Sequence, residues 1–214
     1  TPRAQNGDYD FESIHALDLP LLNDHLVELL SGRTVEPPFY NFKTGQREYS
    51  GRKLQVGPDQ VLLVEGIHGL NPDLTASIPR DQKMLIYISA LTQLSIDHHN
   101  RIPTTDTRLI RRIVRDNQFR NHDALQTLRL WPAVRSGEEV NIFPFQEEAD
   151  VIFNSALIYE LSVLRQYAEP LLAKITPEYP EYLEARRLTG FLRHFRLAPP
   201  DQVPSTSILR EFIG

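Results

Sequence analysis

The stretch from Val61 to Glu65 constrains the fold more than any other part of the sequence. Four apolar residues in a row, two of them valine, end abruptly in a carboxylate, and Gly66 follows at once. Such a run is typical of a central strand that is buried on both faces. Ligands of open α/β sheets bind beyond the carboxyl ends of the strands. The stretch therefore predicts a strand whose terminal Glu65 meets a ligand or a metal ion; the alternative is a strand-end carboxylate that faces water.

Apolar patterns elsewhere predict that strands and helices alternate along the chain. Further strands are expected over residues 84–89, 140–145 and 150–154. Helices are expected over residues 18–30, 104–120, 124–134, 156–175 and 181–195, the third broken by its proline. This alternation argues for an α/β fold with a mainly parallel sheet.

Composition excludes several classes of protein. The 214 residues carry a net charge of -5, which gives no global basic field for nucleic acid. The chain has no cysteine, so disulfide scaffolds, thiolate metal sites and thiol catalysis are ruled out. No apolar stretch reaches membrane-spanning length. We therefore expect a cytoplasmic protein without a membrane partner, and the sequence leaves its oligomeric state open, a homo-oligomer included.

A second informative stretch runs from residue 104 to residue 120. At about 100° per residue, its aliphatic side chains fall on one helix face and four arginines on the other. The aliphatic residues are Leu109, Ile110, Ile113 and Val114, and the arginines are Arg108, Arg111, Arg112 and Arg115. Arginine is the better bidentate partner for phosphate oxygens. The pattern predicts a guanidinium row for an anionic ligand; the alternative is an exposed face paired with carboxylates elsewhere.

These pieces together favour phosphoryl transfer. That chemistry depends on positioning and charge neutralisation rather than on covalent catalysis by the protein. Glu65 is a candidate to hold Mg²⁺ directly or through water. Arg112 and Arg115 are candidates to stabilise charge on the transferring phosphoryl group.

Four segments carry a resemblance to a known family. They are residues 10–18, the loop Val35-Glu36-Pro37-Pro38-Phe39-Tyr40-Asn41-Phe42, the segment Val64-Glu65-Gly66-Ile67, and the helix from Asp106 to Asp116 with its D-x-R-L-x-R-R-x-x-R-D pattern. Over residues 10–168 or so, the sequence resembles the uridine kinase and phosphoribulokinase family of P-loop kinases, in particular the bacterial uridine kinase-like proteins. The last two segments are fairly specific together.

The resemblance implies a P-loop kinase-like three-layer sandwich and ATP-dependent transfer of a phosphoryl group to a small-molecule hydroxyl, such as that of uridine, with ATP and Mg²⁺ bound. The resemblance implies that Glu65 binds Mg²⁺ and takes part in catalysis. It implies that Arg112 and Arg115 are catalytic and that, together with Arg120, they bind the nucleotide phosphates. On the acceptor side it implies that Arg120 and Glu12 bind the acceptor, with Glu12 at the place of a ribose-binding Asp, and that Tyr40 stacks near the acceptor base. Gly45, Asn121 and His122 depart from the family pattern, which puts uridine itself more in question than phosphoryl transfer.

One motif of that family does not occur in the sequence. The phosphate-cradling pattern Gly-x-x-x-x-Gly-Lys-[Ser/Thr] is missing. We expect it before Thr1, with residues 1–175 forming an incomplete kinase-like domain and residues 176–214 a helical extension and tail, and we expect no turnover by this chain alone. The alternative function is a non-catalytic α/β module that binds an anionic ligand or partner through the arginine-faced helix.

Overall fold

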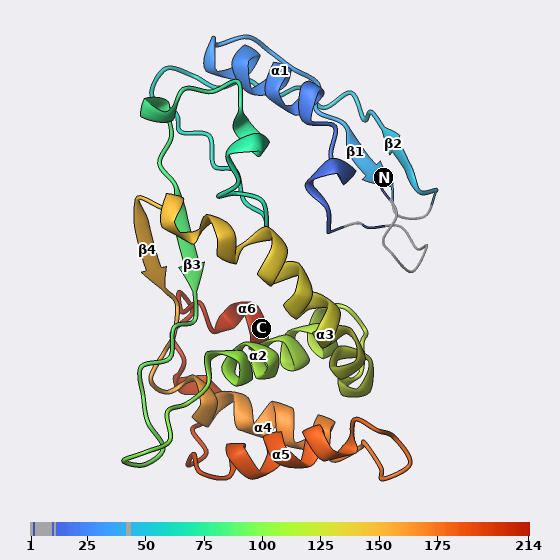
Figure 1. Cartoon of the computed structure of the whole chain (residues 1–214), viewed down its shortest axis with the longest axis vertical. Helices are drawn as coiled ribbons and strands as arrows, with labels where there is room; N and C mark the ends of the chain where they lie inside the picture. The colour runs from blue at the N-terminus through green and yellow to red at the C-terminus, as the bar shows by residue number, and fades with distance from the viewer. Residues whose placement is uncertain (1, 3–9, 11, 42–43) are drawn as a thin grey trace. The chain divides into compact units, whose positions relative to one another are not determined.

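The computed structural model of the chain describes residues 2, 10, 12–41 and 44–214 (Figure 1). It divides into two compact units. The first comprises residues 1–87 and 137–151, and the second comprises residues 88–136 and 152–214. The site described below lies within the second unit. A boundary at residue 175 between a kinase-like domain and an extension stays a prediction.

The first unit begins with short helical elements and a hairpin. Helix α1 (Leu19–Leu30) starts where the sequence predicts, because the Asp18 carboxylate accepts a hydrogen bond from the Leu21 amide at 3.2 Å. Strands β1 (Phe39–Asn41) and β2 (Gln46–Glu48) form an antiparallel hairpin. Short 3₁₀ helices complete this unit: η1 (Ile14–Ala16), η2 (Pro72–Thr75), η3 (Arg80–Gln82) and η4 (Phe143–Glu148).

The predicted strand over residues 61–64 is wrong. In the described structure these residues belong to no strand, and Val61 and Leu63 are 93% and 83% exposed. An apolar run forms a central strand only where strands pair with both of its edges. Among the described residues no strand lies in register beside it. Glu65 therefore follows an exposed, irregular segment.

A small parallel sheet is present. It consists of β3 (Ile86–Ser89) and β4 (Val151–Asn154). The Asp150 amide donates to the Leu85 carbonyl at 2.9 Å, and the Ser155 amide donates to the Ser89 carbonyl at 2.8 Å, so both strands run in one direction. The strands expected over 84–89 and 150–154 are confirmed, which is consistent with an α/β fold. The strand expected over 140–145 is wrong, because these residues end a helix and begin η4.

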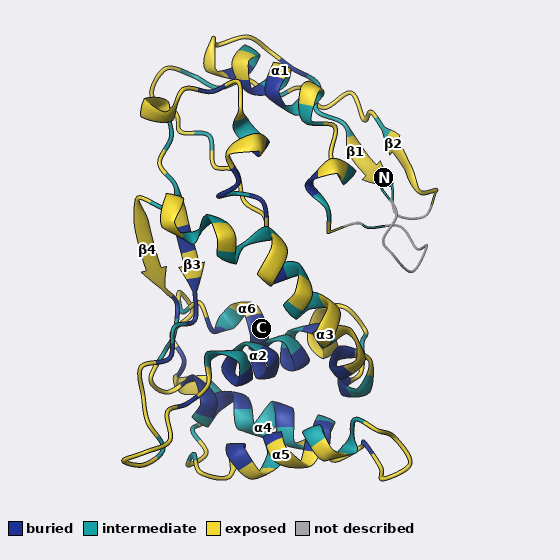
Figure 2. Ribbon diagram, in the orientation of Figure 1, coloured by how far each residue is buried: buried dark blue, intermediate teal, exposed yellow. Residues whose placement is uncertain are grey.

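Helices build the core of the second unit. They are α2 (Thr104–Phe119), α3 (Ala124–Asn141), α4 (Glu160–Leu172), α5 (Tyr182–Leu192) and α6 (Arg210–Ile213), with the 3₁₀ helix η5 (Pro200–Gln202) before the last. Helix α2 packs on α4 and α6, and α4 packs on α5. Figure 2 shows buried residues concentrated in α2 and α4. Four expected helices are confirmed with shorter ends.

Two helix predictions need correction. Helix α3 continues through Pro132 and past Gly137 instead of breaking there. A proline inside a helix costs about 3 kcal/mol, and the packing of Leu128 and Trp131 against the core offsets that cost. The Thr/Asp cluster over residues 104–106 is a typical N-cap signal, yet α2 has Pro103 as its N-cap and no side-chain hydrogen bond there. Among the described residues, no helix is both long and apolar enough to cross a bilayer.

Candidate functional site

The candidate site is a cavity of about 240 Å³ in the second unit. It opens beside the last residues of β3 and the first residue after β4, where ligands of α/β sheets bind. Its lining consists of Ile88, Ser89, Ala90, Arg108, Arg111, Arg112, Arg115, Trp131, Val134, Ser155, Ile208, Glu211 and Phe212. We call this cavity the arginine pocket. All four arginines of the predicted row belong to its lining.

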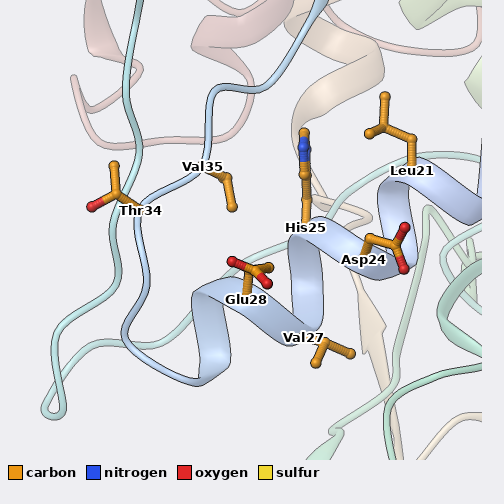
Figure 3. Close-up of a pocket in the computed structure, with 7 residues that line it drawn as sticks. All are labelled: Leu21, Asp24, His25, Val27, Glu28, Thr34 and Val35. Atoms are coloured by element: carbon orange, nitrogen blue, oxygen red, sulfur yellow. The ribbon is translucent and has the colours of Figure 1, made fainter.

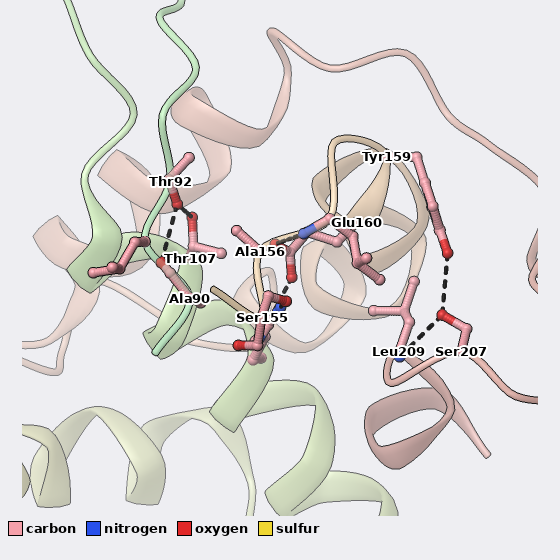
Figure 4. Close-up of polar contacts among 12 residues, drawn as sticks. Ala90, Thr92, Thr107, Ser155, Ala156, Tyr159, Glu160, Ser207 and Leu209 are labelled. Atoms are coloured by element: carbon pink, nitrogen blue, oxygen red, sulfur yellow. Dashed lines mark hydrogen bonds and ion pairs between the residues drawn. The ribbon is translucent and has the colours of Figure 1, made fainter. Parts of the chain in front are cut away.

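Local hydrogen bonds hold the strand ends and α2 together. The Thr92 hydroxyl lies 3.4 Å from the Ala90 carbonyl and 3.3 Å from the Thr107 hydroxyl (Figure 4). Arg101 donates to the Thr92 carbonyl from Nε at 3.0 Å and from Nη2 at 2.7 Å. These contacts join the loop after β3 to the first turns of α2. They fix the direction in which the arginines of that helix project.

Arg111 does not belong to a solvent-facing row, which corrects the sequence interpretation. Its side chain is buried, and Nε pairs with the Glu160 carboxylate at 2.5 Å. Its Nη1 donates to the Ser155 hydroxyl at 3.1 Å, and its Nη2 donates to the Ser155 carbonyl at 2.6 Å. The guanidinium also lies 5.1 Å from the centroid of the Phe212 ring. Arg111 therefore anchors α2 to α4 and to the end of β4. Periodicity missed this because the partners are distant in sequence.

Arg112 and Arg115 share a carboxylate at the end of α2. Arg112 Nε lies 3.2 Å from Asp116 Oδ2, and Arg115 Nε lies 3.8 Å from Asp116 Oδ1. Arg120, at the C-cap, also pairs with Asp116 Oδ1 at 3.2 Å. Arg115 further pairs with Glu211 of α6 at 3.3 Å. Arg120 is not part of the pocket lining, so the structure groups it with Asp116 rather than with the cavity.

The pocket combines guanidinium groups with an apolar wall. Among the described lining residues, Glu211 is the one with a carboxylate. Among the described ion pairs, Arg111 contacts Glu160, Arg112 contacts Asp116, and Arg115 contacts both Asp116 and Glu211. Trp131, Val134, Ile208 and Phe212 supply the apolar part of the lining. Such a pocket attracts an anion that carries a flat or apolar group.

The contribution of the C-terminal segment was not visible in the sequence. Ile208, Glu211 and Phe212 line the pocket, although residues 176–214 were expected to form only a helical extension and tail. The Ser207 hydroxyl lies 3.1 Å from the Tyr159 hydroxyl, which fastens this segment beside α4 (Figure 4). The weak signal that could have indicated it is the apolar pair Phe212-Ile213 at helical spacing from Leu209.

The remaining predicted residues lie in the first unit. Glu65 is exposed, Glu12 is exposed, and Tyr40 stands exposed on β1. The convergence of Glu65 with the arginine row on one cleft stays a prediction. Among the described residues, no three His, Asp or Glu side chains gather closely enough to hold a metal ion. A role for Glu65 in binding Mg²⁺ stays a prediction.

His68, in the first unit, is a buried residue that the sequence did not single out. Burial lowers the pKa of its imidazole, although a hydrogen bond to the backbone of Glu12 and the nearby carboxylates of Glu12 and Asp10 act in the opposite direction. Its Nδ1 is buried and has no hydrogen-bond partner in the described structure. His68 is thus a buried imidazole that interacts with Glu12, the residue predicted to bind the acceptor.

A second cavity, of about 490 Å³, lies against α1 (Figure 3). Its lining includes Asp24, His25 and Glu28, with Thr34 and Val35 from the following segment. Glu28 pairs with Arg33 at 3.2 Å. The two carboxylates disfavour an anion there, so this cavity is not a candidate for phosphate.

Fold and pocket together define an α/β protein that gathers guanidinium groups at the ends of parallel strands. The model of the phosphoribulokinase / uridine kinase family matches residues 1–161, and the chain belongs to that family. It is 30% identical over 160 residues to a uridine kinase of Mycoplasma pneumoniae, an alignment that covers 74% of this chain and 66% of that protein.

Two further relatives show the same likeness. A uridine kinase of Bacillus pumilus is 30% identical over 138 residues, with 64% of this chain and 57% of the relative covered. A uridine kinase of Schizosaccharomyces pombe is 32% identical over 126 residues, with 59% and 24% covered. The chain thus spans two thirds or less of the length of these curated relatives.

Proposed function

We propose that the arginine pocket binds the phosphoryl groups of a nucleotide and that the protein transfers a phosphoryl group from ATP to a hydroxyl of a small molecule, a nucleoside such as uridine. The observation that carries this proposal is the lining of one cavity by Arg108, Arg111, Arg112 and Arg115 at the ends of β3 and β4. Membership of the family supports a kinase, and the P-loop kinase-like three-layer sandwich is part of the same proposal.

The arginines have distinct parts in this proposal. Glu160 and Ser155 hold Arg111, so it contributes positive charge to the pocket and keeps α2 in place beside it. Arg112 and Arg115 neutralise charge as it develops on the transferring phosphoryl group. Glu65 would hold Mg²⁺, and the ion would supply charge neutralisation for the nucleotide phosphates.

The acceptor side is proposed from the first unit. Glu12 accepts hydrogen bonds from the hydroxyls of the acceptor, and Tyr40 stacks on its base. Arg120 contributes to binding of the nucleotide phosphates and of the acceptor. Its exposed guanidinium and its pairing with Asp116, beside Arg112 and Arg115, support that part.

The binding step is tested by calorimetric titration of ATP into the chain and into Arg112→Ala and Arg115→Ala. Loss of a charge-assisted contact of about 1.5–3 kcal/mol predicts roughly 10- to 100-fold weaker binding for each variant. The matched control is Arg193→Ala, because Arg193 is 71% exposed at the end of α5 and contacts only Glu169 among the described ion pairs, at 4.0 Å. Unchanged affinity in both pocket variants would refute the phosphate role.

The transfer step needs a separate assay. ATP-dependent phosphorylation of uridine is measured with this chain and with a longer polypeptide that carries the chain together with a P-loop segment. We expect turnover only with the longer polypeptide. ATP binding by both without turnover by either would favour the non-catalytic module that binds an anionic ligand through the arginine-faced helix.

A further inference from the structure

Asp116 is a buried carboxylate surrounded by arginines within the second unit. Its side chain is 1% exposed, and Arg112, Arg115 and Arg120 lie 3.2, 3.8 and 3.2 Å from its oxygens. A buried carboxylate is costly unless it is paired. Three guanidinium groups surround this one carboxylate, more than its own neutralisation requires.

The contacts with Asp116 use particular atoms of the two pocket arginines. Arg112 and Arg115 both approach it through Nε, the nitrogen nearest the main chain. These Nε atoms and Asp116 Oδ2 are buried and make no hydrogen bond in the described structure, so the attraction is mainly Coulombic. Arg112 and Asp116 are also four residues apart on one helix face. The carboxylate therefore restrains the stem of each guanidinium group behind the cavity that both line.

We propose that Asp116 is a positioning residue that orders Arg112 and Arg115 for a phosphoryl ligand; this inference rests on the proposed function. A free arginine side chain has about 2 kcal/mol of rotamer entropy to lose. When the folded protein has already restricted the arginine rotamers, ligand binding no longer carries that entropy cost. Asp116 thus strengthens anion binding although its own charge is negative.

A positioning role for Asp116 differs measurably from a purely electrostatic role and from a purely structural one. If Asp116 acts only through its charge, its removal raises the positive field and tightens anion binding. If it only stabilises the fold, its removal lowers the melting temperature and leaves the affinity of the folded protein unchanged. Positioning predicts weaker binding by folded protein. The sign of the change in affinity therefore separates the three roles.

The experiment titrates inorganic tripolyphosphate into the whole chain and its variants by calorimetry at low ionic strength, where screening is weak. Asp116→Asn and Glu211→Gln each remove one negative charge from the partners of Arg115. We expect Asp116→Asn to bind about tenfold more weakly, because the ligand must order two arginine side chains. We expect Glu211→Gln to bind roughly two- to fivefold more tightly, because a half-exposed competitor of the ligand is removed.

A second variant keeps the test valid if Asp116→Asn does not fold. Asp116→Glu preserves the charge and moves the carboxylate by one methylene group. Positioning predicts severalfold weaker binding, on the scale of one imperfectly ordered side chain, whereas a purely electrostatic role predicts no change. Melting curves establish that each variant is folded at the temperature of titration.

A double-mutant cycle provides the readout that a structural role would not move. In a background that carries Arg112→Ala, Arg115→Ala and Arg120→Ala, Asp116→Asn should leave the affinity unchanged, because all three arginines that contact Asp116 are gone. A tenfold loss in that background would overturn the proposal, as would equal or tighter binding by Asp116→Asn alone. If the unmodified chain binds no tripolyphosphate, it is the proposed function that fails. Failure of the proposed function is thus distinguishable from failure of the positioning role, which shows as equal or tighter binding by Asp116→Asn or as a tenfold loss in that background.

Discussion

The buried pair of Arg111 and Glu160 offers the sharpest stability prediction. Their side chains are 8% and 3% exposed, and removing one partner of such a pair leaves a buried charge uncompensated. Arg111→Met also deletes the two hydrogen bonds to Ser155. We expect a loss of about 3–5 kcal/mol in the free energy of unfolding. Adding Glu160→Gln, which retains an acceptor for the Leu157 amide at 3.0 Å, should restore part of that loss.

The assay is urea unfolding followed by tryptophan fluorescence. Trp131 is the single tryptophan of the chain and belongs to the second unit, so it reports the unit that contains the pair. A complete cycle of Arg111→Met, Glu160→Gln and the double variant gives the coupling between the two residues. A cost below about 1 kcal/mol for Arg111→Met, the level of an exposed pair, would refute the argument, as would a double variant whose loss equals the sum of the single losses.

Two further predictions concern pH and the second buried acid of α2. Burial lowers the pKa of His68 below its ordinary value, so the unfolded chain takes up a proton first as pH falls. The free energy of unfolding should therefore decrease from about pH 7 to about pH 5. His68→Gln should flatten this pH dependence in urea melts, and the same pH dependence in both proteins would contradict the prediction. Arg187 donates to half-exposed Glu184 and, at 2.6 and 2.7 Å, to both oxygens of buried Asp106, contacts that raise the pKa of Arg187 further above an already high value. Asp106→Asn should therefore cost about 1–3 kcal/mol in thermal unfolding, whereas Glu184→Gln, the matched control on the same guanidinium, should cost under about 1 kcal/mol; equal costs would contradict the difference in burial.

Local signals predicted the elements that local physics determines. Asp18 caps α1 through an amide three residues away, and the apolar positions of α2 are buried as their spacing indicated. Such contacts lie within a turn or two of the chain. The same holds for β3 and β4, whose apolar residues and flanking breaks are visible in a short window. The small parallel sheet could thus be predicted, although its extent could not.

The failures share a different cause. Val61 and Leu63 have the composition of a buried strand, yet burial depends on partner strands that no local pattern contains. Arg111 looks like an outer-face residue by periodicity, and only its partners Glu160 and Ser155, more than forty positions away, bring it into the core. The sequence indicated the arginines of the candidate pocket but not the C-terminal residues that line it. The position of Phe212 depends on tertiary packing alone.

Helix α2 explains why a pocket of arginines can be rigid. Its buried charges point to separate partners along its length: Asp106 to Arg187 of α5, Arg111 to Glu160 of α4, and Asp116 to arginines of its own last turns. A helix held by apolar contacts alone could rotate or slide by small amounts at little cost, whereas each ion pair fixes one angular position and one height. With α2 fixed in this way, the cost of ordering the arginine pocket is met largely during folding. An anion that enters it then meets guanidinium groups whose directions are already set.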